Sequence, residues 1–383
     1  MGTDLLDILK FEDLLMVVLG FTAVIFLPYL HIITNRKIRE STPRWMKWMI
    51  FGELAAGLLL MTGFTYFLVV GKVQDTVLGL ITNSNERIDS NRVINMPIPR
   101  PLTEQDTADF TRWDPALGRW CMDGIIRLEA NVTTHKDKDL ELPPGTKLVK
   151  MFTDEGFASR GDAFIMVLSI DENPHTLAII CRGTNSNTEW LEDIEYDLTP
   201  ASFLAYTGDD YYKDVMLHTG FLKVYLNMRN GVMDLVKNYP VKPLNVVVAG
   251  HSSGAAVAAI LSADLDKNAP DVDNIVAYIF GCPRVGNGAF SNYIDTMKNV
   301  VLHRVNNTSD IVPQFPIPIA PNLKKPENPF PYSHVGDIHD FKSNRHSFNA
   351  NHYLSTYADW LDKAMKEANE RIKDSVDNYK DGK

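Results

Sequence analysis

Two long apolar segments dominate the first eighty positions of the chain. Residues Leu14 to Ile33 carry no formal charge over twenty positions, and Trp48 to Val70 contain only Glu53 over twenty-three positions. A helix needs about 20 apolar residues to cross a bilayer. The pattern therefore predicts a two-span transmembrane hairpin within residues 1–80, and a buried core helix is the alternative for each segment.

The charges around these segments predict how the hairpin is oriented. Five basic residues and one acid, Glu40, occupy the connection between the two spans, so the positive-inside rule places this short loop in the cytoplasm. The residues before the first span are mostly acidic, whereas a cleaved signal would be basic there. We therefore expect the segment to stay in the chain. The rest of the chain is then predicted to be exoplasmic, meaning periplasm, lumen or cell exterior.

The pattern changes after the second apolar segment. Residues 81–105 are polar and then rich in proline, which is typical of a linker, although an ordered arm packed on a domain would look the same. Residues 106–383 instead carry short runs of β-branched residues between helical stretches. Their length suits one α/β domain with a sizeable core.

One of these short runs leads into a motif with chemical meaning. The apolar residues Val246–Ala249 precede Gly250-His251-Ser252-Ser253-Gly254, and the small residues Ala255–Ala259 follow. This reads as strand, sharp turn and helix, with glycines that let strand and helix pass closely. The pattern is typical of the nucleophile elbow of the α/β-hydrolase fold, a mostly parallel sheet flanked by helices. A chance match is the alternative for the motif alone.

A nucleophilic serine requires an acid and a base, which follow it along the chain in this fold. The segment 301–313 reads as a buried strand that ends in a polar turn and delivers Asp310 at its edge. Asp310 is the predicted acid, and an ordinary turn aspartate is the alternative.

The base must come from the histidines downstream of the serine. His303 lies within an apolar strand and before the acid, so we expect a core residue there. His352 opens the last amphipathic helix and is the predicted base, with His334 as its main competitor. The full set of candidates is His303, His334, His339, His346 and His352.

Two backbone donors would have to stabilise the oxyanion of the reaction. Ser253 follows the nucleophile and can supply one N–H. The strand Thr176–Cys181 runs into Arg182-Gly183-Thr184-Asn185, where Thr184 can supply the other. A common turn at the end of a strand is the alternative for this second segment.

Together, these residues resemble the class 3 lipases, the fungal triacylglycerol lipase family. The resemblance covers about Cys121 to Trp360, and five segments follow the order of the family. They are Arg182-Gly183-Thr184 with Glu189-Trp190-Leu191-Glu192-Asp193, His218-Thr219-Gly220-Phe221, Gly250-His251-Ser252-Ser253-Gly254, Phe280-Gly281-Cys282-Pro283-Arg284-Val285-Gly286-Asn287 and Asp310-Ile311-Val312-Pro313.

The resemblance implies a role for each candidate. Ser252 would be the nucleophile, Asp310 the orienting acid and His352 the base, with Thr184 and Ser253 as the oxyanion hole. His334 falls in a family segment that precedes the base, so it is set aside. Two residues depart from the usual pattern, namely Ser253, where leucine is common, and Cys282.

The resemblance also implies a mobile lid over the site. It would cover about Asn185 to Ile194, with Trp190 and Leu191 on its apolar face. A fixed surface helix is the alternative reading of the same residues.

Composition narrows the possible partners. The net charge of −10 comes entirely from residues 81–383, since residues 1–80 hold seven basic and seven acidic residues. Such a surface does not favour nucleic acid. The three cysteines indicate no disulfide framework, and no Cys or His spacing suits a metal, so no cofactor is expected. Asn131, Asn306 and Asn307 each begin a short pattern that fits a glycosylation acceptor.

The sequence therefore predicts a membrane-anchored serine hydrolase that cleaves carboxylic esters of lipids, acylglycerol or phospholipid, through an acyl-enzyme. Its expected partners are the lipid ester substrate and the bilayer. An acyltransferase or thioesterase with the same triad is one alternative. A non-catalytic membrane scaffold is the other.

Overall fold

The computed structural model describes residues 112–134, 141–153, 163–183, 196–204, 214–322, 325, 327–346 and 348–380. All of them belong to the second of two units of the chain, Thr82–Lys383. The two predicted transmembrane spans, the predicted linker and the predicted lid lie outside the described residues. Among the helices that the structure describes, none is long and apolar enough to cross a membrane.

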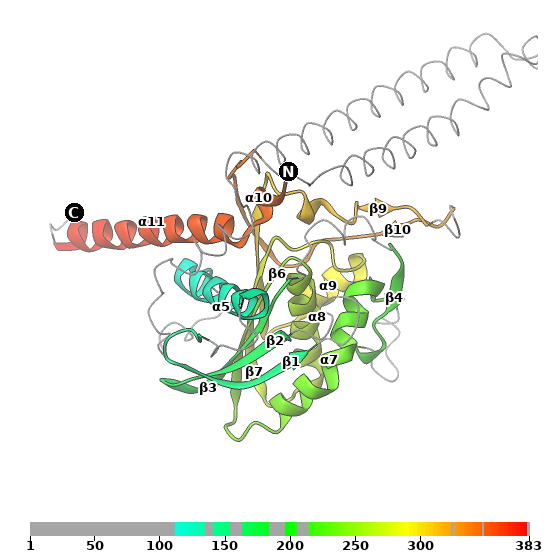
Figure 1. Cartoon of the computed structure of the whole chain (residues 1–383), viewed down its shortest axis with the longest axis horizontal. Coiled ribbons are helices and arrows are strands. Elements are labelled where there is room, and N and C mark those ends of the chain that lie inside the picture. Colours follow the sequence, from blue (N-terminus) through cyan, green and yellow to red (C-terminus); the bar gives the residue numbers. More distant parts are fainter. Residues whose placement is uncertain are drawn as a thin grey trace, which may run out of the picture. The chain divides into compact units, whose positions relative to one another are not determined.

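A seven-stranded sheet forms the centre of this unit, with helices on both faces (Figure 1). The strands of the sheet are β1 Thr146–Thr153, β2 Ala163–Ile170, β3 Asn173–Cys181, β6 Leu244–His251, β7 Val272–Phe280, β8 Val300–Asn307 and β11 Asp337–Phe341. The helices are α5 Pro115–Thr134, α7 Thr219–Lys237, α8 Ser253–Asn268, α9 Gly288–Thr296, α10 Phe348–His352 and α11 Leu354–Lys380. The remaining elements are β4 Leu198–Pro200, β5 Met216–His218, β9 Ile319–Ala320, β10 Phe330–Pro331 and the 3₁₀ turns η2 Ser202–Leu204 and η4 Val312–Gln314.

The sheet is mostly parallel. Its strand order is β1-β2-β3-β6-β7-β8-β11. The five strands from β3 to β11 pair in parallel, while β1, β2 and β3 pair antiparallel at one edge. Since helices cover parallel strands on both faces, their side chains are apolar in both directions. The predicted α/β architecture, a mostly parallel sheet flanked by helices, is confirmed for the described residues.

Strand β6 shows how the alternation of side chains builds two apolar layers. Val246 and Val248 belong to the core on the side of α7, α8 and α9. Val247 and Ala249 belong to the core on the side of α5 and α11. Successive side chains of a strand point to opposite faces, so one run of β-branched residues serves both layers. This places β6 in the middle of the molecule, with its C-terminal end at the predicted turn.

Helix α8 packs directly on the sheet because its side chains are small. All thirteen residues from Ser253 to Leu265 are buried, and five of them are alanine. Small side chains allow the helix axis to approach β6 and β7 closely. The structure therefore confirms the predicted strand, turn and helix around the serine.

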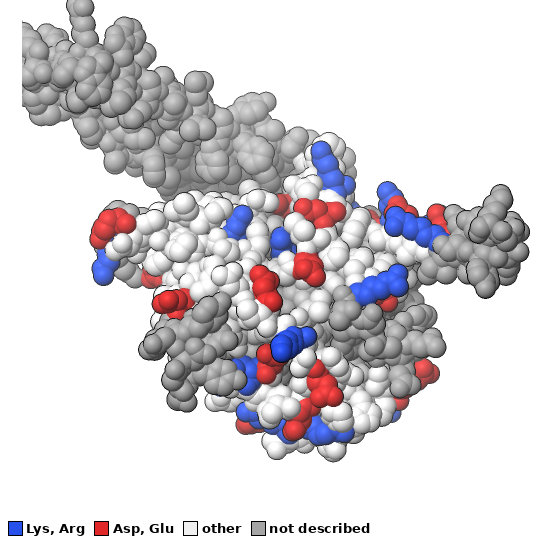
Figure 2. Space-filling model, turned by 180° about the vertical axis from the view of Figure 1, so that it is seen from behind, with Lys and Arg blue, Asp and Glu red and all other residues white. Residues whose placement is uncertain are grey.

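Charged side chains on the surface are of both signs. On the face drawn in Figure 2, Lys and Arg lie interspersed with Asp and Glu. Such a mixture creates no extended field of one sign among the described residues of that face.

Candidate active site

The turn between β6 and α8 holds Ser252 in an unusual backbone conformation, with φ of 58° and ψ of −129°. Few residues other than glycine adopt such angles, which cost free energy and cluster at functional sites. The two glycines make the turn possible. A Cβ at Gly250 would lie 2.3 Å from the Gly254 carbonyl oxygen, and a Cβ at Gly254 would lie 2.3 Å from the Arg182 carbonyl oxygen. Neither position can hold a side chain.

Contacts with the neighbouring strands fix Ser252 in place. Its backbone N–H donates to the carbonyl of Phe280, at the end of β7, over 3.0 Å. On the other side, Gly183, which comes just after β3, lies so close to Ser252 that a Cβ there would be 3.2 Å from the Ser252 Cβ. The side chain of Ser252 is fully buried, and its Oγ has no hydrogen-bond partner among the described residues. A buried hydroxyl without a partner is costly and therefore needs an explanation.

Asp310 and His352 form a buried pair. The His352 Nδ1 lies 2.6 Å from the Asp310 Oδ2, and both side chains are almost completely excluded from solvent. A carboxylate can only accept, so Nδ1 carries a proton, and in the neutral ring Nε2 is the nitrogen with the lone pair. Nε2 has no hydrogen-bond partner among the described residues. This is the protonation state that a general base requires.

Asp310 is itself held by two donors. The backbone N–H of Val312, the first residue of η4, donates to Oδ1 over 2.9 Å. The hydroxyl of Tyr357, on α11, donates to Oδ2 over 2.6 Å. Burial raises the pKa of Tyr357 well above its usual range, and the adjacent Asp310 raises it further, so the phenol stays a donor. Each carboxylate oxygen therefore accepts a hydrogen bond from a group other than His352, and these bonds fix the orientation of the carboxylate.

Several contacts bring His352 to the same place as Ser252. A Cβ at Gly281, directly after the residue that accepts the Ser252 N–H, would lie 2.9 Å from the His352 Cε1. The His251 ring, directly before Ser252, packs on the His352 ring with their centroids 4.3 Å apart. The described contacts contain no hydrogen bond between Ser252 Oγ and His352 Nε2. Such bonds are often long in the absence of substrate.

The ring of His251 is uncharged beside this pair. Burial lowers the pKa of His251 well below its usual value, and the nearby His352 lowers it further. A neutral ring at this position adds no positive charge that would oppose protonation of His352.

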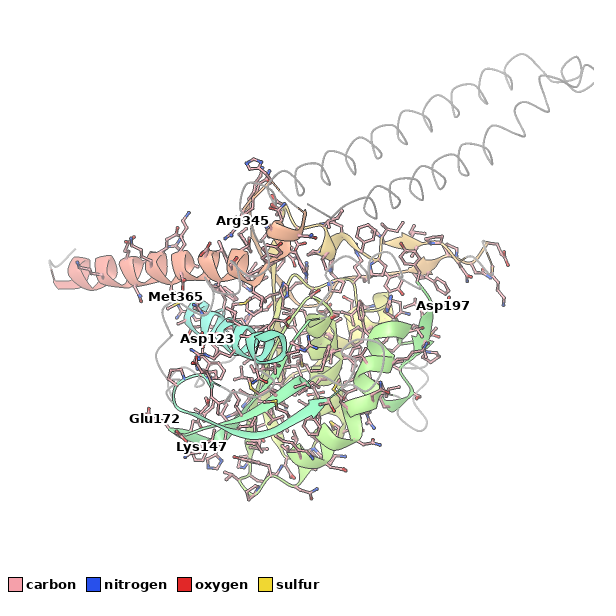
Figure 3. All side chains as sticks on the ribbon, in the orientation of Figure 1. Asp123, Lys147, Glu172, Asp197, Arg345 and Met365 are labelled. Carbon is pink, nitrogen blue, oxygen red and sulfur yellow. The ribbon has the colours of Figure 1, made fainter. Side chains whose placement is uncertain are left out.

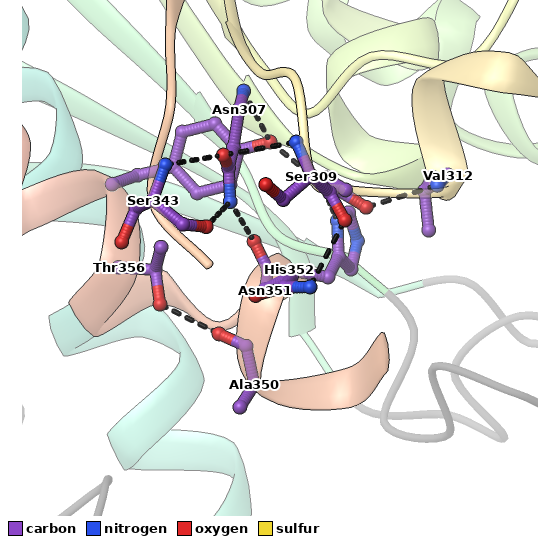
Figure 4. A network of polar contacts seen from close by, with 10 residues as sticks. Asn307, Ser309, Val312, Ser343, Ala350, Asn351, His352 and Thr356 are labelled. Atoms are coloured by element: carbon purple, nitrogen blue, oxygen red, sulfur yellow. Dashed lines mark hydrogen bonds and ion pairs between the residues drawn. The ribbon is translucent and has the colours of Figure 1, made fainter. Parts of the chain in front are cut away.

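A network of amides braces the loop that carries the acid (Figure 4). Asn307 donates from Nδ2 to the carbonyls of Ser343 and Asn351 over 2.8 and 2.9 Å. Its Oδ1 accepts from the N–H groups of Ser309 and Ser343. Asn351 donates in turn to the carbonyl of Ser309 over 3.0 Å. The residues next to Asp310 and His352 are thereby tied directly to each other.

Arg345, which is labelled in Figure 3, secures the short helix α10 that carries the histidine. Its backbone N–H donates to the Asn351 Oδ1 over 2.7 Å. Its guanidinium contacts Ser355 and forms an ion pair with Asp359, both on α11. His352 is the last residue of α10, whereas the sequence predicted that it would open the final helix. The chain forms two helices here, with Tyr353 between them.

The structure describes only part of the predicted oxyanion hole. Ser253 is buried and begins α8, where the first N–H groups of a helix lack partners within it. Thr184 lies outside the described residues, although the preceding Gly183 is described and lies beside Ser252. The predicted lid residues Trp190 and Leu191 also lie outside.

The other candidate histidines lie elsewhere. His303 contacts His339 over 3.2 Å, and both rings pack against Trp113. Burial, together with the nearby guanidinium groups of Arg304 and Arg284, lowers the pKa of His334 to about 3. His346 is exposed. Among the described contacts of Asp310, His352 is the histidine that reaches it.

One sequence expectation changes with the structure. Asn306 and Asn307 are buried and engaged, so the predicted glycosylation patterns at these positions do not present an accessible side chain. The three cysteines are free and buried. Among the described residues, no group of three or more His, Cys, Asp and Glu side chains could hold a metal ion.

Tyr357, Asn307 and Asn351 were not identified from the sequence. Tyr357 reads as one apolar residue of an amphipathic helix, and it reaches Asp310 across 47 positions. Pairing over such a separation leaves no local pattern. Asparagine next to a predicted acid and base was the available signal.

Comparisons with known proteins point to one family. Residues 178–319 match the family model described as Lipase (class 3), a range that includes Ser252 and Asp310. Phospholipase A1-II 1 of Oryza sativa subsp. indica is 28% identical over 196 residues, which cover 45% of this chain and 49% of the relative. The lipase of Rhizomucor miehei is 32% identical over 151 residues, covering 38% of this chain and 39% of the relative. The chain thus spans about half the length or less of these curated relatives.

Among solved structures, the chain is similar to the Rhizomucor miehei lipase propeptide complex. The match has a TM-score of 0.46 and 23% sequence identity, and it covers 64% of this chain and 71% of the other.

Proposed function

We propose that the protein is a serine hydrolase that cleaves carboxylic esters of lipids. Ser252 is the nucleophile, His352 the general base and Asp310 the acid that orients it. The observation that carries this proposal is the buried hydrogen bond between His352 and Asp310 beside a serine held at positive φ. The match of residues 178–319 to class 3 lipases supports the same assignment.

The proposed mechanism proceeds in two steps. The Ser252 Oγ attacks the ester carbonyl while the His352 Nε2 takes its proton, and Asp310 stabilises the imidazolium that forms. The backbone N–H groups of Ser253 and Thr184 stabilise the tetrahedral oxyanion. His352 returns the proton to the leaving alcohol. Water then attacks the acyl-enzyme by the same route and releases the acid.

A lipid substrate is inferred from the relatives. The curated matches bear the names phospholipase A1 and lipase, which denote hydrolysis of esters in phospholipids and acylglycerols. We propose esters of this class as substrates of this chain, with acylglycerol and phospholipid as the two headgroup types to compare.

The decisive experiment measures hydrolysis by the full chain and by Ser252→Ala. Substrates would be short soluble esters, a triacylglycerol emulsion and phosphatidylcholine vesicles. We expect hydrolysis of the lipid esters and a loss of at least about 10³-fold in the variant. Labelling of the unaltered chain by a serine-directed phosphonate, and none of Ser252→Ala, would support the same nucleophile. Equal activity of both proteins would refute the assignment.

Competition with an added alcohol or thiol separates hydrolysis from acyl transfer. A hydrolase gives free acid as its main product, whereas an acyltransferase gives mainly the new ester or thioester. Absence of any phosphonate labelling would favour the scaffold alternative.

We further propose that residues 14–33 and 48–70 anchor the protein in a bilayer as a two-span hairpin. Their length and lack of charge support the anchor, and the basic connection supports a cytoplasmic loop. The hydrolase domain then faces the periplasm, the lumen or the cell exterior.

Thiol labelling in intact cells tests this topology. All three native cysteines are buried, so an impermeant maleimide would report on introduced cysteines. We expect Glu172→Cys, in the exposed turn between β2 and β3, to react in cells or in vesicles that expose the exoplasmic face. Ser41→Cys, in the connecting loop, should react only after permeabilisation. The reverse pattern would overturn the orientation, and extraction of the chain by alkaline carbonate would overturn the anchor.

A further inference from the structure

The segment after the acid presents apolar side chains to solvent. In Ile317-Pro318-Ile319, the two isoleucines are 43% and 67% exposed, and Ile319 has the largest exposed fraction among the large hydrophobic residues of the described chain. The segment continues into β9, which pairs with β10, so that Ile319 lies opposite Pro331. We call the described residues 317–322 and 327–331 the arm. Figure 1 shows β9 and β10 projecting from the body of the domain.

The base of the arm is firmly held. The Arg284 guanidinium donates to the carbonyls of Gln314 and Pro316 over 2.6 and 2.8 Å. The backbone N–H of Tyr332 donates to the carbonyl of Pro318 over 2.8 Å. The isoleucines are therefore held outward in the folded chain, and binding through them would need little further loss of conformational entropy.

The arm also begins at the candidate active site. Ile317 follows Asp310 by seven positions, and the intervening turn η4 supplies the N–H that binds the Asp310 carboxylate. In Figure 1 the arm leaves the domain at the same end as α10, whose last residue is His352. A surface that covers the arm would therefore lie next to the site of ester cleavage.

The chemistry of the arm favours a lipid surface over a protein partner. Six prolines occupy positions 316–331, and both short strands are flanked by them, so their edges offer few of the N–H donors needed to add a strand from another chain. Six exposed or half-buried apolar residues, at 317–319 and 329–331, are also too few for a stable protein interface, which engages about 20 to 30 residues on each side. Exposed apolar residues in such a small, rigid ribbon suit insertion between lipid headgroups.

We propose that the arm docks on the surface of a lipid bilayer through Ile317 and Ile319 and brings the active site to its substrate. The role of docking, to bring the active site to a lipid ester, rests on the proposed function. Docking itself requires no catalysis, so the two can fail separately.

Quenching by lipid measures the docking directly. The full chain carrying Ser252→Ala and Ile319→Cys would be labelled with an environment-sensitive dye, since the native cysteines are buried. Phosphatidylcholine vesicles with brominated acyl chains should quench this dye and shift its emission to the blue. The matched control is Leu226→Cys on α7, which is 46% exposed and distant in sequence from the arm. Equal quenching at both positions, or none at Ile319→Cys, would overturn the proposal.

An activity ratio provides the second readout. For Ile317→Ser with Ile319→Ser, the rate on phosphatidylcholine vesicles relative to the rate on a soluble short-chain ester should fall at least about tenfold. Leu226→Ser should leave the ratio as it is. A ratio that does not change in the arm variant would refute docking through these isoleucines. If Ser252→Ala keeps its rates on both the vesicles and the soluble ester, the proposed function is refuted, and the quenching result still stands.

Discussion

Tyr357 shows how a residue outside the motifs can control the orientation of the acid. Its hydroxyl and the Val312 N–H fix the two carboxylate oxygens, so that Asp310 faces His352. Hydrogen bonds to charged groups contribute about 1.5 to 3 kcal/mol. Part of this free energy is expected to appear in the transition state, where His352 is charged.

We therefore predict that Tyr357→Phe lowers kcat by about tenfold and leaves KM nearly unchanged. Steady-state kinetics on a soluble ester would measure both. Tyr278→Phe is the matched control, because it removes a buried hydroxyl that donates to the Asp114 carbonyl, away from the acid. If both variants lose kcat equally, a general loss of packing is the cause and the positioning role is wrong.

The glycines of the turn give a second prediction. A methyl group at Gly254 would meet the Arg182 carbonyl oxygen at 2.3 Å, which only a backbone shift can relieve. We expect Gly254→Ala to lower the free energy of unfolding by about 3 kcal/mol and to displace the serine. Urea denaturation would measure the loss. Gly288→Ala, with its nearest atom at 3.6 Å, should change stability little, and an equal loss there would contradict the steric argument.

Helices α7 and α8 are joined by a buried polar contact. Asp264, on α8, accepts from the Tyr225 hydroxyl and from Arg229, whose Nη2 lies 3.0 Å from Oδ1. Asn268 donates to the same carboxylate over 2.6 Å. The side chain of Asp264 is fully buried, so its charge depends on these donors.

We predict that Asp264→Ala lowers the free energy of unfolding by about 3 to 5 kcal/mol, since Arg229 loses its partner and a cavity forms. The change would be read from urea denaturation. Asn274→Ala removes an exposed contact between neighbouring strands and should cost far less. A small effect of Asp264→Ala would mean that water enters and solvates the remaining groups.

The elements of the sheet could be predicted from the sequence more easily than their partners. The β-branched run of β6 and the alanines of α8 give strand, turn and helix from local pattern alone. The antiparallel edge formed by β1 and β2 was not predicted. Nor was the bracing of Asp310 by Asn307 and Tyr357. These depend on contacts between distant segments, which a single sequence does not record.

At the scale of the whole molecule, the buried histidines couple stability to pH. Burial lowers the pKa of His218 and of His303 to about 4 each, and of His334 to about 3. In the unfolded chain the same groups bind protons near their ordinary pKa of about 6.5. Between about pH 6.5 and 4, the unfolded state therefore holds more protons than the folded state.

We predict that the free energy of unfolding falls as the pH drops through this range. Each such histidine adds a slope of up to about 1.4 kcal/mol per pH unit. Urea denaturation of the full chain at pH 7.5, 6.5, 5.5 and 4.5 would measure the slope. His218→Gln should reduce this slope, because it removes one of the buried histidines. The amide oxygen of the glutamine can still accept from the N–H groups at the start of α7, as Nδ1 does now, so the helix should be retained. Stability independent of pH above 4.5 would show that these rings bind protons as readily in the folded chain as in the unfolded chain, and would contradict the prediction.

The turn at Ser252 makes the reactivity of the serine depend on complete folding of the domain. Its backbone conformation depends on Arg182, directly after β3, on the end of β7 at Phe280 and on β6 itself. The acid and the base come from later parts of the chain, which hydrogen bonds of Asn307 and Asn351 hold together. A nascent or misassembled chain therefore contains the serine but not a reactive one. A covalent probe of that serine would count correctly folded molecules, and it would leave the partly folded ones unmarked.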